Sequence, residues 1–169
     1  MIDVPKRFKV IVNPKAGKGK AASIYRDYVR PILVAAGCNI VDGGTDDNQT
    51  DITHVVTTTR AKEALDIAEH LNVDMYDAIL CIGGDGVIHE VINGLARKQD
   101  GITALKKIAI GTIPAGTIPS SFSLTVGSGN ALSRSLFGEC HPSYAAWQAV
   151  KCTETNYQSD SQTKQWLQT

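Results

Sequence analysis

Short apolar runs alternate along the chain with segments of helical period. The apolar runs predict strands at residues 8–12, 38–41, 53–57, 78–82 and 108–113. Apolar residues spaced three and four positions apart predict helices at about 20–36, 60–71, 86–97, 128–137 and 142–152. This alternation implies βαβ units, and therefore an α/β fold of three layers, in which a mainly parallel sheet carries helices on both faces.

Two residues define the end and the shape of the first predicted helix. Pro31 lacks the N–H that would bond to the carbonyl of Asp27, so we expect a kink or a restart there. Gly37 follows the last apolar residues and is expected to cap the helix.

The polar, glycine-rich residues 42–51 are expected to form an exposed loop.

The composition is that of a globular domain. The chain has 169 residues, of which 43% are hydrophobic and 20% are charged. Seventeen basic residues balance seventeen acidic ones, so no overall field would attract nucleic acid or an anionic membrane. Any membrane contact is expected to be peripheral and to come from a local patch or from a further domain.

The four cysteines predict reduced thiols. They show no metal-type spacing, and Cys38 and Cys81 lie in apolar, strand-like runs. This usage fits a cytoplasmic protein better than a disulfide scaffold. The sequence shows neither a signal peptide nor a long apolar run, so we expect neither secretion nor a membrane span.

The most informative stretch is residues 83–95, which read Gly-Gly-Asp-Gly-Val-Ile-His-Glu-Val-Ile-Asn-Gly-Leu. A strand, a glycine turn and a helix in succession can present backbone N–H groups to phosphate. We expect the amides of Gly83, Gly84 and Gly86 to hold phosphates, with Asp85 exposed among them. The alternative is a tight turn in which Asp85 only caps the helix.

A second glycine-containing turn follows the strand at 8–12 and reads Asn-Pro-Lys-Ala-Gly-Lys-Gly-Lys over residues 13–20. Gly17 and Gly19 open the backbone, and three lysines offer positive charge to a polyanion. The spacing is not that of a Walker A loop. Alone, the segment fits an ordinary basic loop equally well, but beside the glycine turn we interpret it as part of a phosphate site.

These two turns resemble motifs of the diacylglycerol kinase catalytic fold, a family that includes diacylglycerol, ceramide and sphingoid-base kinases. Residues 83–95 resemble its GGDGxxxEVxNGL signature, with Glu90, Asn93 and Gly94 at the family spacings. Residues 13–19 resemble its Asn-Pro-x-x-Gly-x-Gly turn. The resemblance implies a Rossmann-like nucleotide-binding domain. In the family a second, mostly β domain holds the lipid, and we expect it to be missing from this chain.

A third resemblance is split in two. Residues 113–116, Ile-Pro-Ala-Gly, and residues 127–133, Gly-Ser-Gly-Asn-Ala-Leu-Ser, look like the halves of one family motif. Its Ser-Gly-Asn-Ala form resembles the sphingoid-base kinases, and residues 141–152 resemble the fungal members of that branch.

Joining Gly116 to Ser128 restores the family motif and leaves residues 117–127 as an eleven-residue insertion. We therefore expect a diacylglycerol-kinase-type catalytic domain over residues 1–154, interrupted by that insertion. Residues 155–169 are expected to form a polar tail outside the family.

The resemblance implies transfer of the γ-phosphoryl group of ATP to the primary hydroxyl of a sphingoid base, with Mg²⁺ bridging phosphate oxygens. In this reaction Asp85 is expected to accept the hydroxyl proton. The residues implied to contact or shape the nucleotide site are Asn13, Pro14, Lys15, Gly17, Gly19, Thr58, Gly83, Gly84, Gly86, Glu90, Ser128, Gly129 and Asn130. Thr58 is equally well read as a strand-end residue without a role, and His89 is expected on the helix surface.

Two other functions stay open at this point. One keeps the lipid kinase and changes the acceptor to diacylglycerol or ceramide, whereas residues 128–131 and Glu90 argue against NAD as the acceptor. The other is a catalytically inactive nucleotide-binding fragment, favoured by the expected loss of the lipid domain and by the split motif.

Overall fold

The computed structural model describes residues 6–43, 52–115 and 141–151 of the chain. Its five strands form one sheet in the order β2-β3-β1-β4-β5, and every neighbouring pair is parallel. The strands are β1 (Phe8–Val12), β2 (Asn39–Asp42), β3 (Ile52–Thr57), β4 (Ala78–Gly83) and β5 (Ala109–Pro114). Because all of them are parallel, their carboxyl ends lie at the same edge of the sheet.

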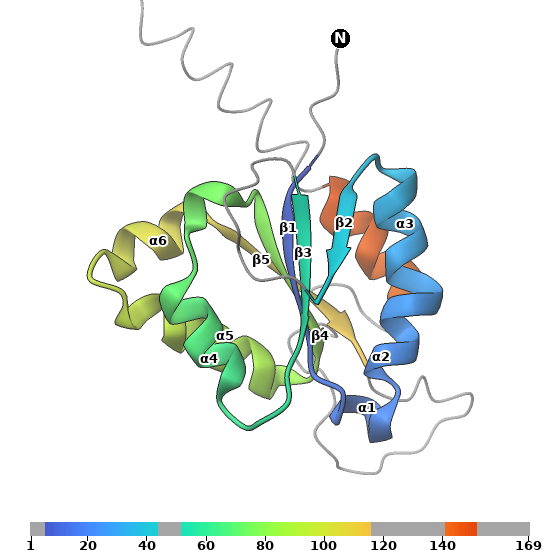
Figure 1. Ribbon diagram of the computed structural model, residues 1–169, viewed down its shortest axis with the longest axis horizontal. Coiled ribbons are helices and arrows are strands. Elements are labelled where there is room, and N and C mark those ends of the chain that lie inside the picture. The colour runs from blue at the N-terminus through green and yellow to red at the C-terminus, as the bar shows by residue number, and fades with distance from the viewer. Residues whose placement is uncertain (1–5, 44–51, 116–140, 152–169) are drawn as a thin grey trace, which may run out of the picture.

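Helices cover both faces of the sheet (Figure 1). One face carries α1 (Ala16–Gly19), α2 (Ala21–Ile24), the π-helix η1 (Tyr25–Val29), α3 (Arg30–Ala35) and a helix over residues 142–151. The other face carries α4 (Glu63–His70), the 3₁₀ turn η2 (Val73–Met75), α5 (Asp85–Arg97) and α6 (Gly101–Lys107). The predicted three-layer α/β fold is therefore confirmed.

The core consists of two apolar clusters, one on each face of the sheet. Successive residues of the central strand β1 point to opposite faces, and all five are buried. Val10 and Val12 pack with η1 and α3 on one side, whereas Ile11 packs with α4 and α5 on the other. A strand buried on both faces reads as a continuous apolar run, which is why β1 and β4 were recognisable in the sequence.

All five predicted strands are confirmed within one residue at each end. The helix after the glycine turn begins at Asp85, one residue before its predicted start. The last predicted helix, at 142–152, is confirmed over residues 142–151.

The predicted helix at 20–36 is not one continuous α-helix. Because Pro31 has no N–H, the turn before it widens, and the N–H of Arg30 bonds to the carbonyl of Tyr25, five residues back. The α3 helix then restarts with Pro31 in its first turn. Gly37 caps the end with φ +79°, and the N–H of Cys38 reaches the carbonyl of Leu33 at 3.0 Å.

Two further helices differ from the prediction. The helix predicted at 60–71 begins only at Glu63, because Lys62 takes a left-handed conformation with φ +62° and interrupts the helical path. The α6 helix was not predicted. It starts at a glycine and is only seven residues long, too short for a helical period to stand out.

Other predictions fall outside the described residues. They are the helix at 128–137, the insertion at 117–127, the tail at 155–169 and residues 44–51 of the loop expected at 42–51, whose first residue, Asp42, ends β2. Within the described part of the chain, no helix is long and apolar enough to cross a membrane.

Candidate functional site

Three loops meet at the carboxyl edge of the sheet. They follow β3, β1 and β4, and β1 lies between the other two strands. The N–H of Thr58, after β3, donates to the carbonyl of Val12 at 2.8 Å. The N–H of Asn13, after β1, donates to the carbonyl of Ile82 at 3.0 Å. The glycine turn therefore faces the basic turn, in the position where open α/β sheets bind ligands.

The glycine turn joins β4 directly to α5. Gly84 is the N-cap of that helix, and Asp85 is its first residue and is half-buried. A Cβ added to Gly84 or Gly86 would meet no described atom within 4 Å, so a ligand can approach the backbone at both positions. Gly83 differs, because its Cβ would lie 2.9 Å from Cγ2 of Val87. Its lack of a side chain serves the packing of β4 against α5.

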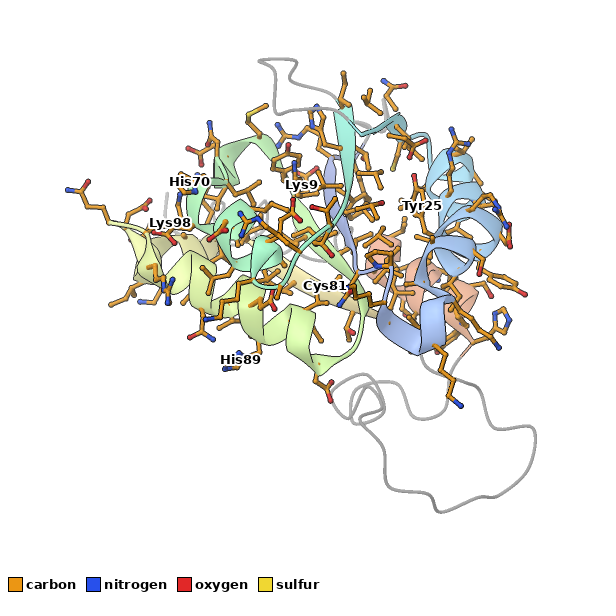
Figure 2. All side chains as sticks on the ribbon, turned by 60° about the horizontal axis from the view of Figure 1, so that its bottom comes forward. Lys9, Tyr25, His70, Cys81, His89 and Lys98 are labelled. Atoms are coloured by element: carbon orange, nitrogen blue, oxygen red, sulfur yellow. The ribbon has the colours of Figure 1, made fainter. Side chains whose placement is uncertain are left out.

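Among the polar residues of α5, some face the pocket and others face solvent. Glu90 is half-buried and faces the loop after β3. His89 projects from the helix into solvent, while Cys81 of β4 lies in the interior (Figure 2). His89 is thus a surface residue, as expected. Its carbonyl accepts a hydrogen bond from Nδ2 of Asn93 at 2.7 Å, which keeps that amide on the same face.

The basic turn is held by its own hydrogen bonds. Oδ1 of Asn13 accepts from the N–H of Lys15 at 3.0 Å, so Pro14 lies inside an Asx turn. The next residues form the short helix α1, in which Gly17 and Lys18 have φ values of +60° and +57°. The three lysines of the turn, Lys15, Lys18 and Lys20, are all exposed. Their charges are therefore available to an anionic ligand.

A pocket of about 190 Å³ opens between the loop after β3 and the start of α5. Four residues singled out in the sequence line it, namely Asn13, Lys15, Thr58 and Glu90. Ligand pockets usually measure roughly 300–1,000 Å³. The described residues therefore enclose only part of a nucleotide-sized site.

The sequence did not point to the other residues of the pocket, which are Thr59, Arg60, Ala61, Ala64 and Val87. Only their position could have identified most of them, because they follow β3, the strand next to the central strand β1. Thr58 itself is 8% exposed, and its hydroxyl lies 3.4 Å from the carbonyl oxygen of Val12. It therefore ties β3 to β1 in addition to lining the pocket.

The carboxylates at this edge decide how a Mg²⁺ ion fits the site. Among the described residues, no three His, Cys, Asp or Glu side chains gather into a metal site. Asp85 and Glu90 both project from the first turns of α5. Because Mg²⁺ commonly takes one or two carboxylates together with phosphate oxygens and water, the Glu90 carboxylate, which lines the pocket, fits an ion that arrives with ATP.

The structure thus brings together most of the residues predicted for the site. The predicted nucleotide contacts from the first two motifs, and Thr58, lie at one edge of the sheet. Ser128, Gly129 and Asn130 lie outside the described residues.

Known proteins with similar sequences are lipid kinases. Sphingoid long chain base kinase 5 of Saccharomyces cerevisiae is 38% identical over 146 residues, which are 86% of this chain and 18% of that protein. Sphingoid long chain base kinase 4 of Schizosaccharomyces pombe is 36% identical over 152 residues, which are 90% of this chain and 28% of that protein. The chain therefore spans less than a third of the length of either relative.

A solved structure agrees with the fold. The crystal structure of a diacylglycerol kinase from Bacillus anthracis str. Sterne superposes with a TM-score of 0.58 and 25% identity, over 86% of this chain and 42% of that one. Residues 7–160 match the model of the diacylglycerol kinase catalytic domain. With these motifs at the carboxyl edge of a parallel sheet and a match over most of its length, the chain belongs to the diacylglycerol kinase catalytic domain family.

Proposed function

We propose that the chain is the nucleotide-binding part of an ATP-dependent lipid kinase that phosphorylates the primary hydroxyl of a sphingoid base. The observation that carries this proposal is one pocket lined by the loops after β1 and β3 and by helix α5. Asn13, Thr58 and Glu90 come from three different elements and line it together. Beside them, the open backbone at Gly84 and Gly86 offers N–H groups at the start of a helix.

Each part of the site has a role in the proposed reaction. The amides of the glycine turn and the exposed lysines of the basic turn hold the phosphates, while the loop after β3 shapes the pocket. The acceptor oxygen bonds to the γ-phosphorus, the bond to the β–γ bridging oxygen breaks, and ADP leaves. Bound Mg²⁺ supplies positive charge to the phosphate oxygens during this transfer.

Asp85 takes the proton of the acceptor hydroxyl in this proposal. A carboxylate is a weak base, but phosphoryl transfer has a loose transition state in which the attacking oxygen needs little deprotonation. Its position supports the role, because Asp85 starts α5 between Gly84 and Gly86, where a ligand has access to the backbone.

We assign the acceptor to the sphingoid bases because the two relatives described above are named for that substrate. We also place the protein in the cytoplasm, in peripheral contact with the membrane that contains the lipid. The buried free thiols of Cys38 and Cys81 support a reducing compartment.

The test has two steps. Calorimetric titration of the chain with ATP and Mg²⁺ should show binding, and an Asp85→Asn variant should bind ATP within a few-fold of it. Labelled ATP is then offered with a sphingoid base, a ceramide or a diacylglycerol, first to the chain and then to a full-length relative. Transfer to ceramide or diacylglycerol alone would reassign the acceptor, binding without transfer would favour an inactive nucleotide-binding fragment, and no ATP binding would overturn the proposal.

A further inference from the structure

The loop between β3 and α4 forms one wall of the pocket, and Thr59 and Arg60 are the polar residues of this loop that line it beyond Thr58. Thr58 anchors the beginning of this loop, because its N–H bonds to the carbonyl of Val12 at 2.8 Å. The rest of the loop lies outside the sheet, and Thr59, Arg60 and Lys62 are exposed. Its conformation therefore depends on contacts from outside the sheet.

A single carboxylate oxygen supplies those contacts. Oε2 of Glu63, the first residue of α4, accepts from the N–H of Thr59 at 2.5 Å and from the N–H of Arg60 at 3.0 Å. It also accepts from the hydroxyl of Thr59 at 2.9 Å. Three donors within two residues thus converge on one atom, and charged acceptors form the stronger hydrogen bonds of proteins.

The surrounding charges leave this arrangement intact. The guanidinium of Arg60 turns away to Asp66, with Nη2 2.6 Å from Oδ2, so it does not compete for the Glu63 carboxylate. Lys62 stands next to Glu63 in the left-handed conformation. Such a conformation is unfavourable for a residue with a side chain and persists only where neighbouring contacts fix it.

The opposite wall is fixed independently. Asn13 is tied to β4 through its N–H, and Val87 and Glu90 belong to α5, which packs closely on α4. The backbone of Thr59 and Arg60 is therefore the part of the pocket that depends on Glu63.

We propose that Glu63 is a positioning residue for the nucleotide, one that holds the Thr59–Arg60 backbone in place as a wall of the pocket without lining the pocket itself. The idea rests on the function proposed above. Glu63 is absent from the described residues that line the pocket, so it acts through the loop. The amide of Thr59, then that of Arg60, holds the pKa of Glu63 below its usual range, in line with a carboxylate that is charged when the loop is in place.

The test compares Glu63→Ala, Glu63→Gln and a control, Glu69→Ala, in the full 169-residue chain. Glu69 lies on the same helix and its carboxylate faces Arg97 at 3.9 Å, away from the pocket. The first readout is amide hydrogen exchange without any ligand. In Glu63→Ala, the amides of Thr59 and Arg60 should exchange at least about tenfold faster, while the amide of Thr58 should keep its protection.

The second readout is affinity for ATP and for inorganic tripolyphosphate, both with Mg²⁺. Glu63→Ala should weaken ATP binding about tenfold, the effect of losing roughly one good hydrogen bond, and leave tripolyphosphate binding unchanged. Glu63→Gln keeps an acceptor oxygen and should recover most of both effects, whereas Glu69→Ala should change neither.

Unchanged exchange at Thr59 and Arg60 in Glu63→Ala would overturn the proposal, as would equal losses of ATP and tripolyphosphate affinity. If the unmodified chain does not bind ATP, the proposed function fails. The exchange experiment then still decides whether Glu63 holds the loop.

Discussion

Gly17 of the basic turn is pressed against the backbone of Ala115, the residue that follows β5. A Cβ built on Gly17 would lie 1.5 Å from the carbonyl oxygen of Ala115. The N–H of Ala115 donates in turn to the carbonyl of Gly83 at 3.4 Å. The three segments that resemble family motifs therefore contact one another through backbone atoms, and the basic turn is docked on the end of β5.

Replacing Gly17 with alanine should displace the basic turn. The side chain would collide with backbone that cannot move aside, and it would also occupy the left-handed region at φ +60°. Gly19→Ala is the matched control, because Gly19 has φ +85° but open space around it. The left-handed conformation alone costs roughly 1–2 kcal/mol. Thermal unfolding should therefore show a larger loss of stability for Gly17→Ala, and equal losses would mean that the contact with Ala115 is unimportant.

Asp85→Asn should abolish phosphoryl transfer in a full-length relative and leave ATP affinity within a few-fold. The substitution removes the proposed proton acceptor and keeps the glycine amides that hold the phosphates. Steady-state turnover and equilibrium ATP binding separate the two effects. His89→Gln, one turn further along α5 and exposed, is the control and should retain full turnover. A variant at Asp85 that kept most of its turnover would exclude this residue as the base.

The strands of this fold could be predicted from the sequence because β1 and β4 are buried on both faces and read as apolar runs. The glycine turn and the basic turn were recognisable because they follow those strands. The wall formed by Thr59, Arg60 and Ala61 was not, since its shape depends on hydrogen bonds to Glu63 and on the conformation of Lys62. Local side-chain-to-backbone hydrogen bonds and a single left-handed residue leave no periodic signal in the sequence.

The structural role of Gly94 could not be predicted from the sequence either. It belongs to the family signature, yet it lies at the contact between α4 and α5, not at the phosphate site. A Cβ there would lie 2.3 Å from the carbonyl oxygen of Leu65 and 2.8 Å from Cβ of Ala68. The glycine lets the two helices that flank the pocket approach closely.

Gly94→Ala should therefore destabilise the protein by about 1–3 kcal/mol, the usual effect of overpacking. Gly86→Ala, on the same helix but in open space, should leave stability unchanged or raise it by up to about 1 kcal/mol. For ATP affinity we expect the opposite: Gly86→Ala should lose more than Gly94→Ala if the backbone at Gly86 contacts phosphate, because a methyl group there would obstruct the ligand. Denaturant unfolding and ATP titration of both variants check this pair, and a stable Gly94→Ala protein would contradict the packing argument.

The stabilisation provided by Glu63 should depend on pH. Hydrogen bonds from Thr59 and Arg60 lower its pKa in the folded state, so the unfolded chain takes up the proton first as pH falls. The contribution is complete above the ordinary glutamate pKa of about 4.3 and disappears as pH drops through the lower folded-state value. The difference in unfolding midpoint between the unmodified protein and Glu63→Gln should shrink over that acidic range. A difference that is the same at all pH values would contradict the assignment.

Deleting residues 117–127 should strengthen nucleotide binding and raise activity in an otherwise complete enzyme. Ala115 belongs to the first half of the split motif, and it contacts Gly17 of the basic turn and Gly83 of the glycine turn. The insertion therefore begins two residues after a position that touches both turns. An extra loop costs little in stability, because closure entropy grows only logarithmically with loop length, so the fold tolerates it. The site tolerates less, since a displacement of about 1 Å can cost about a hundredfold in rate. ATP affinity and turnover of the deletion variant measure the difference, and if both stay the same or fall, the eleven residues are part of the working site.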